Sequence, residues 1–124
     1  MAVALAIGMS GHWITKERRE AVYARDSHTC VYCGGTPDGS AGAILTLDHV
    51  VARENGGSNA SDNLVTSCRS CNSSKQDRSM RSFYADLRAR GIDTNAVSRR
   101  VHSQRRRPVS IERGREIIAA RKAA

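Results

Sequence analysis

The sequence predicts a small α+β domain that is stapled by its four cysteines, with a helix before it and a basic helical extension after it. First, the cysteines form two Cys-x-x-Cys pairs, Cys30 with Cys33 and Cys68 with Cys71, which can place four thiolates around one tetrahedral zinc ion. Second, the 124-residue chain is only 4% aromatic, so its core is thin and a metal staple is expected. Third, a short strand pattern lies between the pairs, and helical patterns lie before and after them.

The segment before the first cysteine pair is expected to contain a tail and one helix. Residues 16–25 lack Gly and Pro, and Thr15 before them is a suitable N-cap, so a short helix is predicted there. Residues 1–7 are apolar but lack a basic flank, and they are too short for a signal peptide or a membrane span. Trp13 is interpreted as a packing anchor for the helix.

The segment between the cysteine pairs is expected to contain a strand and loops. Residues 44–47 are short, apolar and bounded by loops, which is typical of a buried strand. Residues 54–59 are predicted to be a flexible loop, and residues 63–65 to close an irregular segment before Cys68. The pattern turns helical from about Asn72 onward.

Three helices are expected after the second cysteine pair. The first carries an apolar stripe at positions i, i+3, i+4 and i+7, formed by Met80, Phe83, Tyr84 and Leu87, and Gly91 is a suitable stop. A weaker helix is expected from residue 93 or 94, with Val97 and Val101 on one side. Residues 105–108 are interpreted as a basic linker, and Ser110 as the cap of a last helix, although a glycine inside it lowers helix propensity.

The cysteine usage and the element order divide the chain into three predicted parts. These are a tail at residues 1–13, the stapled domain at residues 14–90, and a basic helical extension at residues 91–124. Because the two pairs use all four cysteines, none remains for a disulfide framework, which favours a cytoplasmic location. Two disulfides in a secreted protein are the alternative, and the absence of a signal-like start argues against it.

The positive charge is concentrated after the second cysteine pair. The chain has a formal charge of +8; residues 1–75 carry seven basic and seven acidic residues, whereas residues 76–124 carry thirteen and five. Arg99, Arg100 and residues 105–107 place five arginines within nine positions. Clustered arginines neutralise phosphates and release counterions, so a polyanionic partner is expected. A solvated helix face or a disordered basic tail is the alternative.

Asp48 and His49 are the centre of the candidate chemistry. A neutral imidazole can accept a proton from water near pH 7, and a carboxylate is a hard ligand for a divalent cation. Neighbouring side chains of a strand point to opposite faces, so the pair can serve one site only at a bend or a strand end. Asn72 follows Cys71 directly and could complete a metal site with Asp48. Lys75 lies one helical turn further on, where it could reach a phosphate.

Together these motifs resemble the HNH endonucleases of the zinc-stapled ββα-metal type, over residues 14–84. The resemblance rests on the run Cys30-x-x-Cys33, Leu47-Asp48-His49-Val50, Gly56-Gly57, Asn63-Leu64 and Cys68-x-x-Cys71-Asn72-x-x-Lys75. The third letter of the family motif is Asn here instead of His, a variant that the family often uses.

The resemblance implies a metal-dependent endonuclease that hydrolyses DNA phosphodiester bonds. It implies that His49 is the general base, that Asn63 holds the loop bearing His49 in shape, and that the four cysteines bind structural zinc. It also implies that Asp48 and Asn72 hold the catalytic ion, and an Asn ligand favours Mg²⁺ or Mn²⁺ over zinc there. Many family members have proline where this chain has Ala52, so we expect a looser loop without loss of the chemistry.

DNA contacts are predicted from two regions. Lys75 and Arg78 would lie along a groove near the cut phosphate, with Arg53 of the active loop as a weaker candidate. The basic cluster of Arg105, Arg106 and Arg107 would add contacts to phosphates that do not depend on sequence.

The resemblance leaves the biological role and two other classes of function open. Similar small proteins include phage-encoded nucleases that assist genome packaging, as well as restriction and mobile-element nucleases, so a phage packaging protein is a candidate partner. We expect a monomer or a dimer and no membrane partner. The alternatives are a zinc-knuckle DNA-binding module without catalysis, and an accessory subunit that docks a partner.

Overall fold

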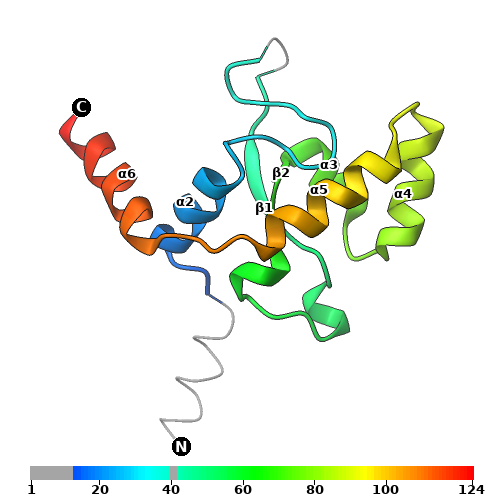
Figure 1. Cartoon of the computed structure of the whole chain (residues 1–124), viewed down its shortest axis with the longest axis horizontal. Helices are drawn as coiled ribbons and strands as arrows, with labels where there is room; N and C mark the ends of the chain where they lie inside the picture. Colours follow the sequence, from blue (N-terminus) through cyan, green and yellow to red (C-terminus); the bar gives the residue numbers. More distant parts are fainter. Residues whose placement is uncertain (1–12, 40–41) are drawn as a thin grey trace, which may run out of the picture.

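The computed structural model describes residues 13–39 and 42–124 (Figure 1). The elements in chain order are α2 (Lys16–Arg25), β1 (Leu45–His49), the 3-10 turns η1 (Arg53–Asn55) and η2 (Ser61–Asn63), β2 (Leu64–Cys68), α3 (Arg69–Lys75), α4 (Met80–Ala89), α5 (Thr94–Arg106) and α6 (Ile111–Ala123). The predicted α+β class is confirmed: five helices accompany a two-stranded sheet in the described residues. Apart from Trp13, the predicted tail lies outside them. Within the described ranges, no helix is long and apolar enough to cross a membrane.

Helix α2 begins and ends where the sequence predicts. The Thr15 side chain accepts a hydrogen bond from the Arg18 backbone N–H at 3.2 Å, which satisfies one of the free donors at the helix start. After the helix, the Asp26 carboxylate pairs with Arg25 at 2.8 Å and accepts from the Thr66 backbone N–H at 2.9 Å. This buried ion pair therefore fixes the end of α2 to strand β2.

Strands β1 and β2 form one antiparallel ribbon, in which Leu45 pairs with Cys68 and His49 pairs with Leu64. The strand predicted at residues 44–47 is shifted and extends to His49. Residues 63–65 were predicted to close an irregular segment, but only Asn63 ends such a turn, η2, whereas Leu64 and Val65 begin a regular strand, β2. All of β2 is buried, so it lacks the alternation of apolar and polar residues that marks a half-buried strand.

The burial of β2 comes from packing on both faces of the ribbon. Leu64 belongs to a small cluster with Val22 of α2. Its neighbour Val65 belongs to the main core cluster with Val97 of α5. Because successive side chains of a strand point to opposite faces, the ribbon lies between helices that come from both ends of the chain (Figure 1).

Helix α3 begins at Arg69, three residues before the start predicted near Asn72. The Cys68 sulfur acts as the N-cap and accepts from the Cys71 backbone N–H at 3.4 Å. A cysteine is not among the usual capping residues, which explains why the sequence pattern placed the start too late. Asn72 therefore lies inside the helix rather than at its beginning.

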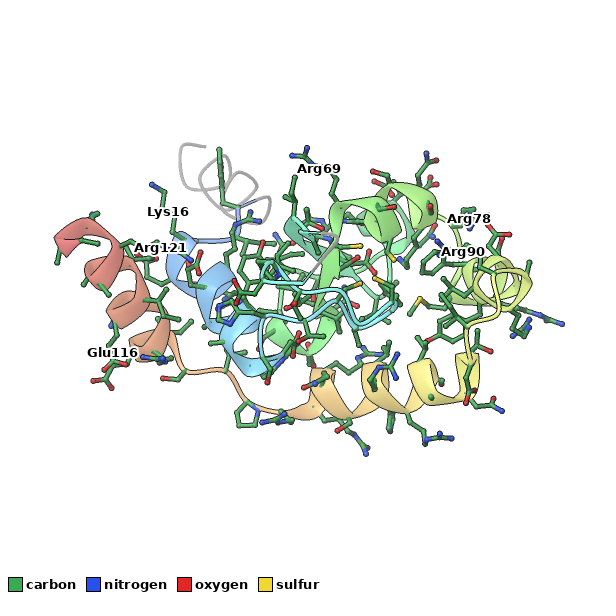
Figure 2. All side chains as sticks on the ribbon, turned by 90° about the horizontal axis from the view of Figure 1, so that it is seen from above. Lys16, Arg69, Arg78, Arg90, Glu116 and Arg121 are labelled. Carbon is green, nitrogen blue, oxygen red and sulfur yellow. The ribbon has the colours of Figure 1, made fainter. Side chains whose placement is uncertain are left out.

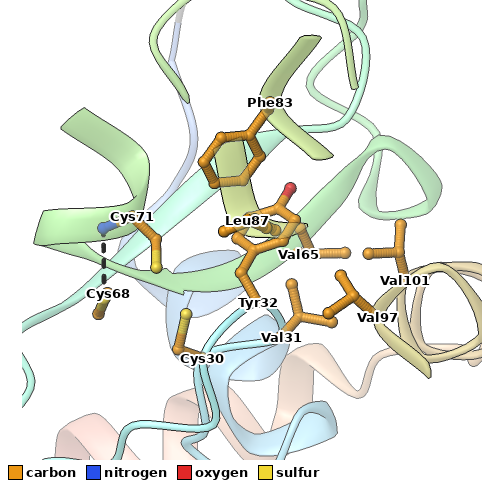
Figure 3. Close-up of a cluster of buried hydrophobic side chains, with 10 residues drawn as sticks. All are labelled: Cys30, Val31, Tyr32, Val65, Cys68, Cys71, Phe83, Leu87, Val97 and Val101. Carbon is orange, nitrogen blue, oxygen red and sulfur yellow. Dashed lines mark hydrogen bonds between the residues drawn. The ribbon is translucent and has the colours of Figure 1, made fainter. Parts of the chain in front are cut away.

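The main core cluster joins the cysteine pairs to the helices that follow them (Figure 3). The Tyr32 and Phe83 rings meet edge to face, with centroids 5.0 Å apart. The buried members of the cluster are Cys30, Val31, Tyr32, Val65, Cys68, Cys71, Phe83, Leu87, Val97 and Val101. Val97 and Val101 belong to α5, so the domain boundary predicted at residue 90 falls inside one packed core.

Helix α4 carries the predicted stripe and stops at the predicted glycine. Phe83 and Leu87 are fully buried. Gly91 has a φ of +83°, its N–H bonds the carbonyl of Arg88 at 2.9 Å, and the Ile92 N–H bonds that of Leu87 at 3.0 Å. These two bonds form a Schellman motif, which needs a left-handed residue at the glycine position.

Helix α5 is longer than the sequence suggests. Asp93 caps it through hydrogen bonds to the backbone N–H groups of Asn95 and Ala96. The helix continues to Arg106, so the interpretation of residues 105–108 as a linker is wrong for its first two arginines. Val97 and Val101 pack one side of α5 against the core. Arg105 and Arg106 lie in the last turn of the helix, beyond these contacts.

Helix α6 packs against α2 at one end of the molecule, whereas α4 lies at the other end (Figure 2). A Cβ atom at Gly114 would lie only 2.1 Å from the Glu17 carbonyl oxygen. Glycine therefore permits a close contact between the two helices, although it weakens α6 on its own. A bidentate pair between Arg121 and Glu20, at 2.8 and 2.9 Å, closes the contact about two turns further along α6.

We expect Gly114→Ala to destabilise the protein. An alanine normally stabilises a helix by about 1 kcal/mol relative to glycine. Here the added methyl group must push α6 away from α2, and overpacking of this kind costs roughly 1–3 kcal/mol. Urea unfolding should show the loss, with the exposed neighbour Arg115→Ala as the control. A Gly114→Ala protein at least as stable as the wild type would contradict the close packing.

Candidate functional site

The four cysteines of the two pairs lie together as predicted. Their sulfur atoms are within 4.8 Å of one another, and all four are free thiols rather than disulfides. Cys33 is exposed, whereas Cys30, Cys68 and Cys71 are buried; Figure 3 shows these three buried cysteines. A zinc ion with Zn–S distances of about 2.3 Å holds its sulfurs about 3.8 Å apart in a tetrahedron, and the Cys33 and Cys68 sulfurs are 3.8 Å apart. The donor set and the spacing both fit zinc.

Backbone N–H groups point at these sulfurs. The Cys33 N–H approaches the Cys30 sulfur at 3.5 Å, and the Gly35 N–H approaches the Cys33 sulfur at 3.4 Å. Such donors stabilise thiolates, which are the form that binds metal. A hydrogen bond from the Cys71 thiol lowers the pKa of Cys30 to about 4, whereas burial raises the pKa of Cys33 and the bond with Cys30 raises the pKa of Cys71. Cys30 is therefore the thiol of the cluster that loses its proton most readily.

The Asp48 carboxylate lies at the end of β1 and is almost fully buried. Tyr32 donates a hydrogen bond to Oδ2, and the Lys75 ammonium lies 3.3 Å from Oδ1. Burial raises the pKa of Asp48, and the bonds from Tyr32 and Lys75 oppose this rise. Each carboxylate oxygen has two acceptor positions, so both oxygens can still ligate a cation.

Lys75 is fully buried, which differs from the exposed position that a phosphate contact requires. Its ammonium donates to Asp48 and to the His49 carbonyl, at 3.3 and 3.0 Å. Lys75 and Cys71 are four residues apart and share the inward face of α3. The prediction that Lys75 binds DNA is therefore replaced by a structural role, because a buried carboxylate needs a paired countercharge.

His49 is the last residue of β1 and is held by a loop residue that the sequence analysis missed. Its Nε2 lies 2.7 Å from the Asn59 side-chain oxygen. An amide oxygen only accepts, so Nε2 is the donor of this bond, and a neutral imidazole then has its lone pair on Nδ1. The Arg18 side chain of α2 donates to the backbone carbonyl of Asn59 at 3.2 Å. No local pattern marks Asn59, since its role depends on how the loop folds back.

Asn63 closes the loop that follows His49. Its side-chain oxygen accepts from the Val51 N–H at 2.9 Å, and its amide donates to the carbonyls of Val51 and Ser58 at 3.0 and 2.9 Å. A Cβ atom at Gly57 would lie 1.7 Å from the Val51 carbonyl oxygen. The tight crossing of the loop thus requires both the asparagine clamp and a glycine.

Ala52, which stands where many of the HNH proteins that this sequence resembles have proline, adopts a backbone conformation that suits proline. Its φ of −59° is close to the value that a proline ring would impose. Its carbonyl accepts hydrogen bonds from the N–H groups of Asn55 and Gly57, both at 2.9 Å. The looser loop expected from the sequence stays a prediction, and the contacts that oppose it are these two bonds and the Asn63 clamp.

Asn72 faces β1 from the middle of α3. Its amide nitrogen donates to the Thr46 hydroxyl at 2.9 Å and to the Leu47 carbonyl at 3.1 Å. Both N–H groups are thereby used on the strand, and the side-chain oxygen is left as the atom that can bind a hard cation.

One pocket, which we call the His49 pocket, brings the predicted residues together. It has a volume of about 500 Å³, and its lining includes Asp48, His49 and Asn72. Arg53 also lines it, as do the acidic residues Glu54 and Asp77, which the sequence analysis did not single out. Carboxylates beside an imidazole and an amide oxygen form a suitable environment for a divalent cation.

The other predicted DNA-binding arginines lie elsewhere. Arg78 forms an ion pair with Asp86 at 2.5 Å, and its guanidinium lies 5.9 Å from the centre of the Phe83 ring. Arg105 donates to the Asp62 carbonyl at 2.6 Å, and Arg107 donates to the Gln104 side chain at 3.2 Å. Arg105 and Arg106 line a separate pocket of about 370 Å³ with Asp62 and His102.

Residues 30–78 match the model of the HNH endonuclease family. Among solved structures, the crystal structure of the Type II-C Cas9 enzyme from Actinomyces naeslundii is similar, with a TM-score of 0.49 and 24% sequence identity. This similarity covers 86% of this chain and 13% of that chain, so the chain spans a small part of that protein's length. A search of curated proteins found no match.

Proposed function

We propose, from the match of residues 30–78 to the model of the HNH endonuclease family, that this chain is an endonuclease that hydrolyses DNA phosphodiester bonds. The observation that carries the proposal is the His49 pocket, where Asp48, His49 and Asn72 meet beside the cysteine cluster. The cysteine cluster brings the two cysteine pairs together. Asp48 and His49 lie between these pairs in the sequence, and Asn72 directly follows the second pair.

His49 acts as the general base in this proposal. The Asn59 oxygen at 2.7 Å holds the proton on Nε2, so Nδ1 can take a proton from an attacking water. The Asn63 clamp fixes the loop that leaves His49. Asn59 thus positions the His49 ring directly, and Asn63 holds the backbone that follows His49.

Asp48 and Asn72 would hold Mg²⁺ or Mn²⁺. A carboxylate and an amide oxygen are hard donors that suit these ions better than zinc. When bound there, the cation would stabilise the negative charge that develops on the phosphate and on the leaving oxygen. Lys75 and Tyr32 keep the Asp48 carboxylate in place. Lys75 also ties α3 to the end of β1 through the His49 carbonyl.

A DNA substrate is consistent with the basic groups around the site. Arg53 lines the His49 pocket itself. Arg105 and Arg106 on α5, together with Arg107, are proposed to contact phosphates further along the duplex. Roles in phage genome packaging or in a mobile element stay predictions from the resemblance.

Plasmid cleavage tests the proposed function. Zinc-loaded protein is incubated with supercoiled plasmid in Mg²⁺, in Mn²⁺, in EDTA, and in buffer without added ion. The last condition is needed because EDTA can also remove zinc, so circular dichroism should accompany the EDTA sample. Nicked or linear DNA that appears only with an added ion is the expected result. Tight binding with no cleavage under either ion would favour a non-catalytic DNA-binding module.

We expect Asn72→Ala to weaken the divalent-cation site. The Mg²⁺ concentration for half-maximal nicking should rise by roughly 10–100-fold or more, since loss of even a supporting group at a metal site costs that much. Calorimetric titration with Mn²⁺ in the absence of DNA should show the same loss. Ser73→Ala, an exposed neighbour on α3, is the control. Unchanged Mg²⁺ dependence in a folded Asn72→Ala protein would contradict the assignment.

A further inference from the structure

Trp13 is not the packing anchor that the sequence suggests. Its side chain is 71% exposed, the highest value among the exposed large hydrophobic residues that the structure describes. The first helix is instead held by Val22 and Tyr23, which pack against the ribbon. An exposed indole contributes nothing to the core, and exposed aromatic surface often marks a binding site.

Trp13 lies on the wall of a second pocket, which we call the Trp13 pocket. Its volume is about 500 Å³, and it lies between the start of α2 and the loop before η2. The lining residues are Trp13, Thr15, Arg18, Arg53 and residues 57–60. Arg53 lines this pocket and the His49 pocket alike.

Asn59 forms a second connection between the two pockets. It lines the Trp13 pocket, while its side-chain oxygen lies 2.7 Å from His49. The Arg18 side chain, which also lines the Trp13 pocket, donates to the backbone carbonyl of Asn59 at 3.2 Å. A ligand in the Trp13 pocket would therefore lie directly beside the residue that orients the proposed general base.

The chemistry of the Trp13 pocket suits a nucleotide. An indole face can stack on any base, which is how many proteins bind single strands and strand ends. Two guanidinium groups, from Arg18 and Arg53, can contact the phosphates on either side of that base. The Ser58 hydroxyl and the backbone of the loop add polar contacts at the rim.

We propose that the Trp13 pocket binds a nucleobase of the DNA strand, adjacent to the phosphate that occupies the His49 pocket. This inference rests on the proposed function, because it takes the ligand of the His49 pocket to be DNA. Arg53 lies at the junction and would contact the phosphate between the two positions. The Trp13 pocket then fixes the strand relative to His49 before cleavage.

The chain provides its own probe, since Trp13 is its only tryptophan. Zinc-loaded protein without Mg²⁺ or Mn²⁺ is titrated with a labelled thymidine oligonucleotide, and with an abasic sugar-phosphate strand of the same length. Tryptophan fluorescence reports on the pocket, and label anisotropy reports on total binding. We expect saturable quenching with the thymidine strand, and much weaker quenching with the abasic strand at equal anisotropy.

Variants define the role of the ring. Trp13→Ala should weaken binding of the thymidine strand by roughly tenfold or more, because that is the usual loss of affinity when one base–aromatic stack is removed. Trp13→Phe should retain most of the affinity, because it keeps an aromatic face. Ile44→Ala, another exposed large apolar residue, is the control and should bind as the wild type does.

The outcomes separate this inference from the proposed function. Unchanged tryptophan fluorescence at oligonucleotide concentrations that saturate the anisotropy would overturn the proposal that the Trp13 pocket binds a nucleobase. The proposed nuclease activity would then still be decided by the plasmid assay. Equal binding by wild type and Trp13→Ala would overturn it as well. Base-dependent quenching in a protein that cleaves no plasmid would support the pocket and contradict the nuclease activity.

Discussion

Replacing Cys68 with alanine should unfold the domain. Binding of structural zinc in small domains is worth about 10–16 kcal/mol, whereas the whole stability of a domain is about 5–15 kcal/mol. Loss of one of four ligands removes a large share of that binding energy. We therefore expect no cooperative unfolding transition for Cys68→Ala under conditions in which the wild type melts sharply.

The position of Cys68 makes this effect larger than that of an ordinary core substitution. Cys68 is the last residue of β2, the N-cap of α3 and a member of the main core cluster. Its sulfur accepts from the Cys71 N–H at 3.4 Å. The substitution removes a metal ligand, a helix cap and a core contact at the same residue, so no neighbouring group can compensate.

Thermal unfolding monitored by circular dichroism, together with zinc release measured by a metal-sensitive dye, checks this prediction. Ser70→Ala is the matched control, because Ser70 is exposed within the same knuckle and contributes no sulfur. Slow chelation of the wild type should give the same loss of structure as the substitution. A folded Cys68→Ala protein with an unchanged melting temperature would show that the cysteine cluster is not a structural metal site.

Elements marked by local side chains were predictable from the sequence. Thr15 and Gly91 act within one turn of the backbone groups that they satisfy, so capping rules place the ends of α2 and α4. The stripe that buries Phe83 and Leu87 is likewise visible in the spacing of a single helix. Interactions of this short range need no knowledge of the rest of the fold.

Features that depend on contacts between distant segments were missed. β2 is buried on both faces by helices from opposite ends of the chain, so its residues do not alternate. Lys75 turns inward because a carboxylate in another element is buried beside it. Asn59 reaches His49 only after the loop crosses itself at Gly57. Each result follows from packing that a local window of sequence cannot represent.

The candidate site lies between these two cases. The cysteine spacing predicts which residues are pinned together, and Asp48, His49 and Asn72 do line one pocket. The partners that orient them were not predictable, since Tyr32 and Lys75 hold Asp48 from two other segments. A motif thus identifies the candidate reacting groups, while the fold decides which protons and lone pairs they present.

His49→Ala should lower the rate of plasmid nicking by roughly 10²–10⁴-fold, which is the usual contribution of a general base. In barrier terms this is about 2.7–5.5 kcal/mol. DNA binding and melting temperature should change little, because the His49 side chain is only part-buried and its ring bonds the side chain of a loop residue, Asn59. The loss therefore falls on the chemical step rather than on the fold.

Single-turnover nicking at saturating Mg²⁺ measures that step directly. His28→Ala is the matched control, since His28 lies outside both pockets, at the end of α2 beside the Tyr23 ring; it should cleave as the wild type does. Added imidazole should restore part of the rate to His49→Gly, because a diffusible base can occupy the space of the missing ring. Near wild-type nicking by His49→Ala would remove His49 from the mechanism, even if the metal dependence of cleavage remained.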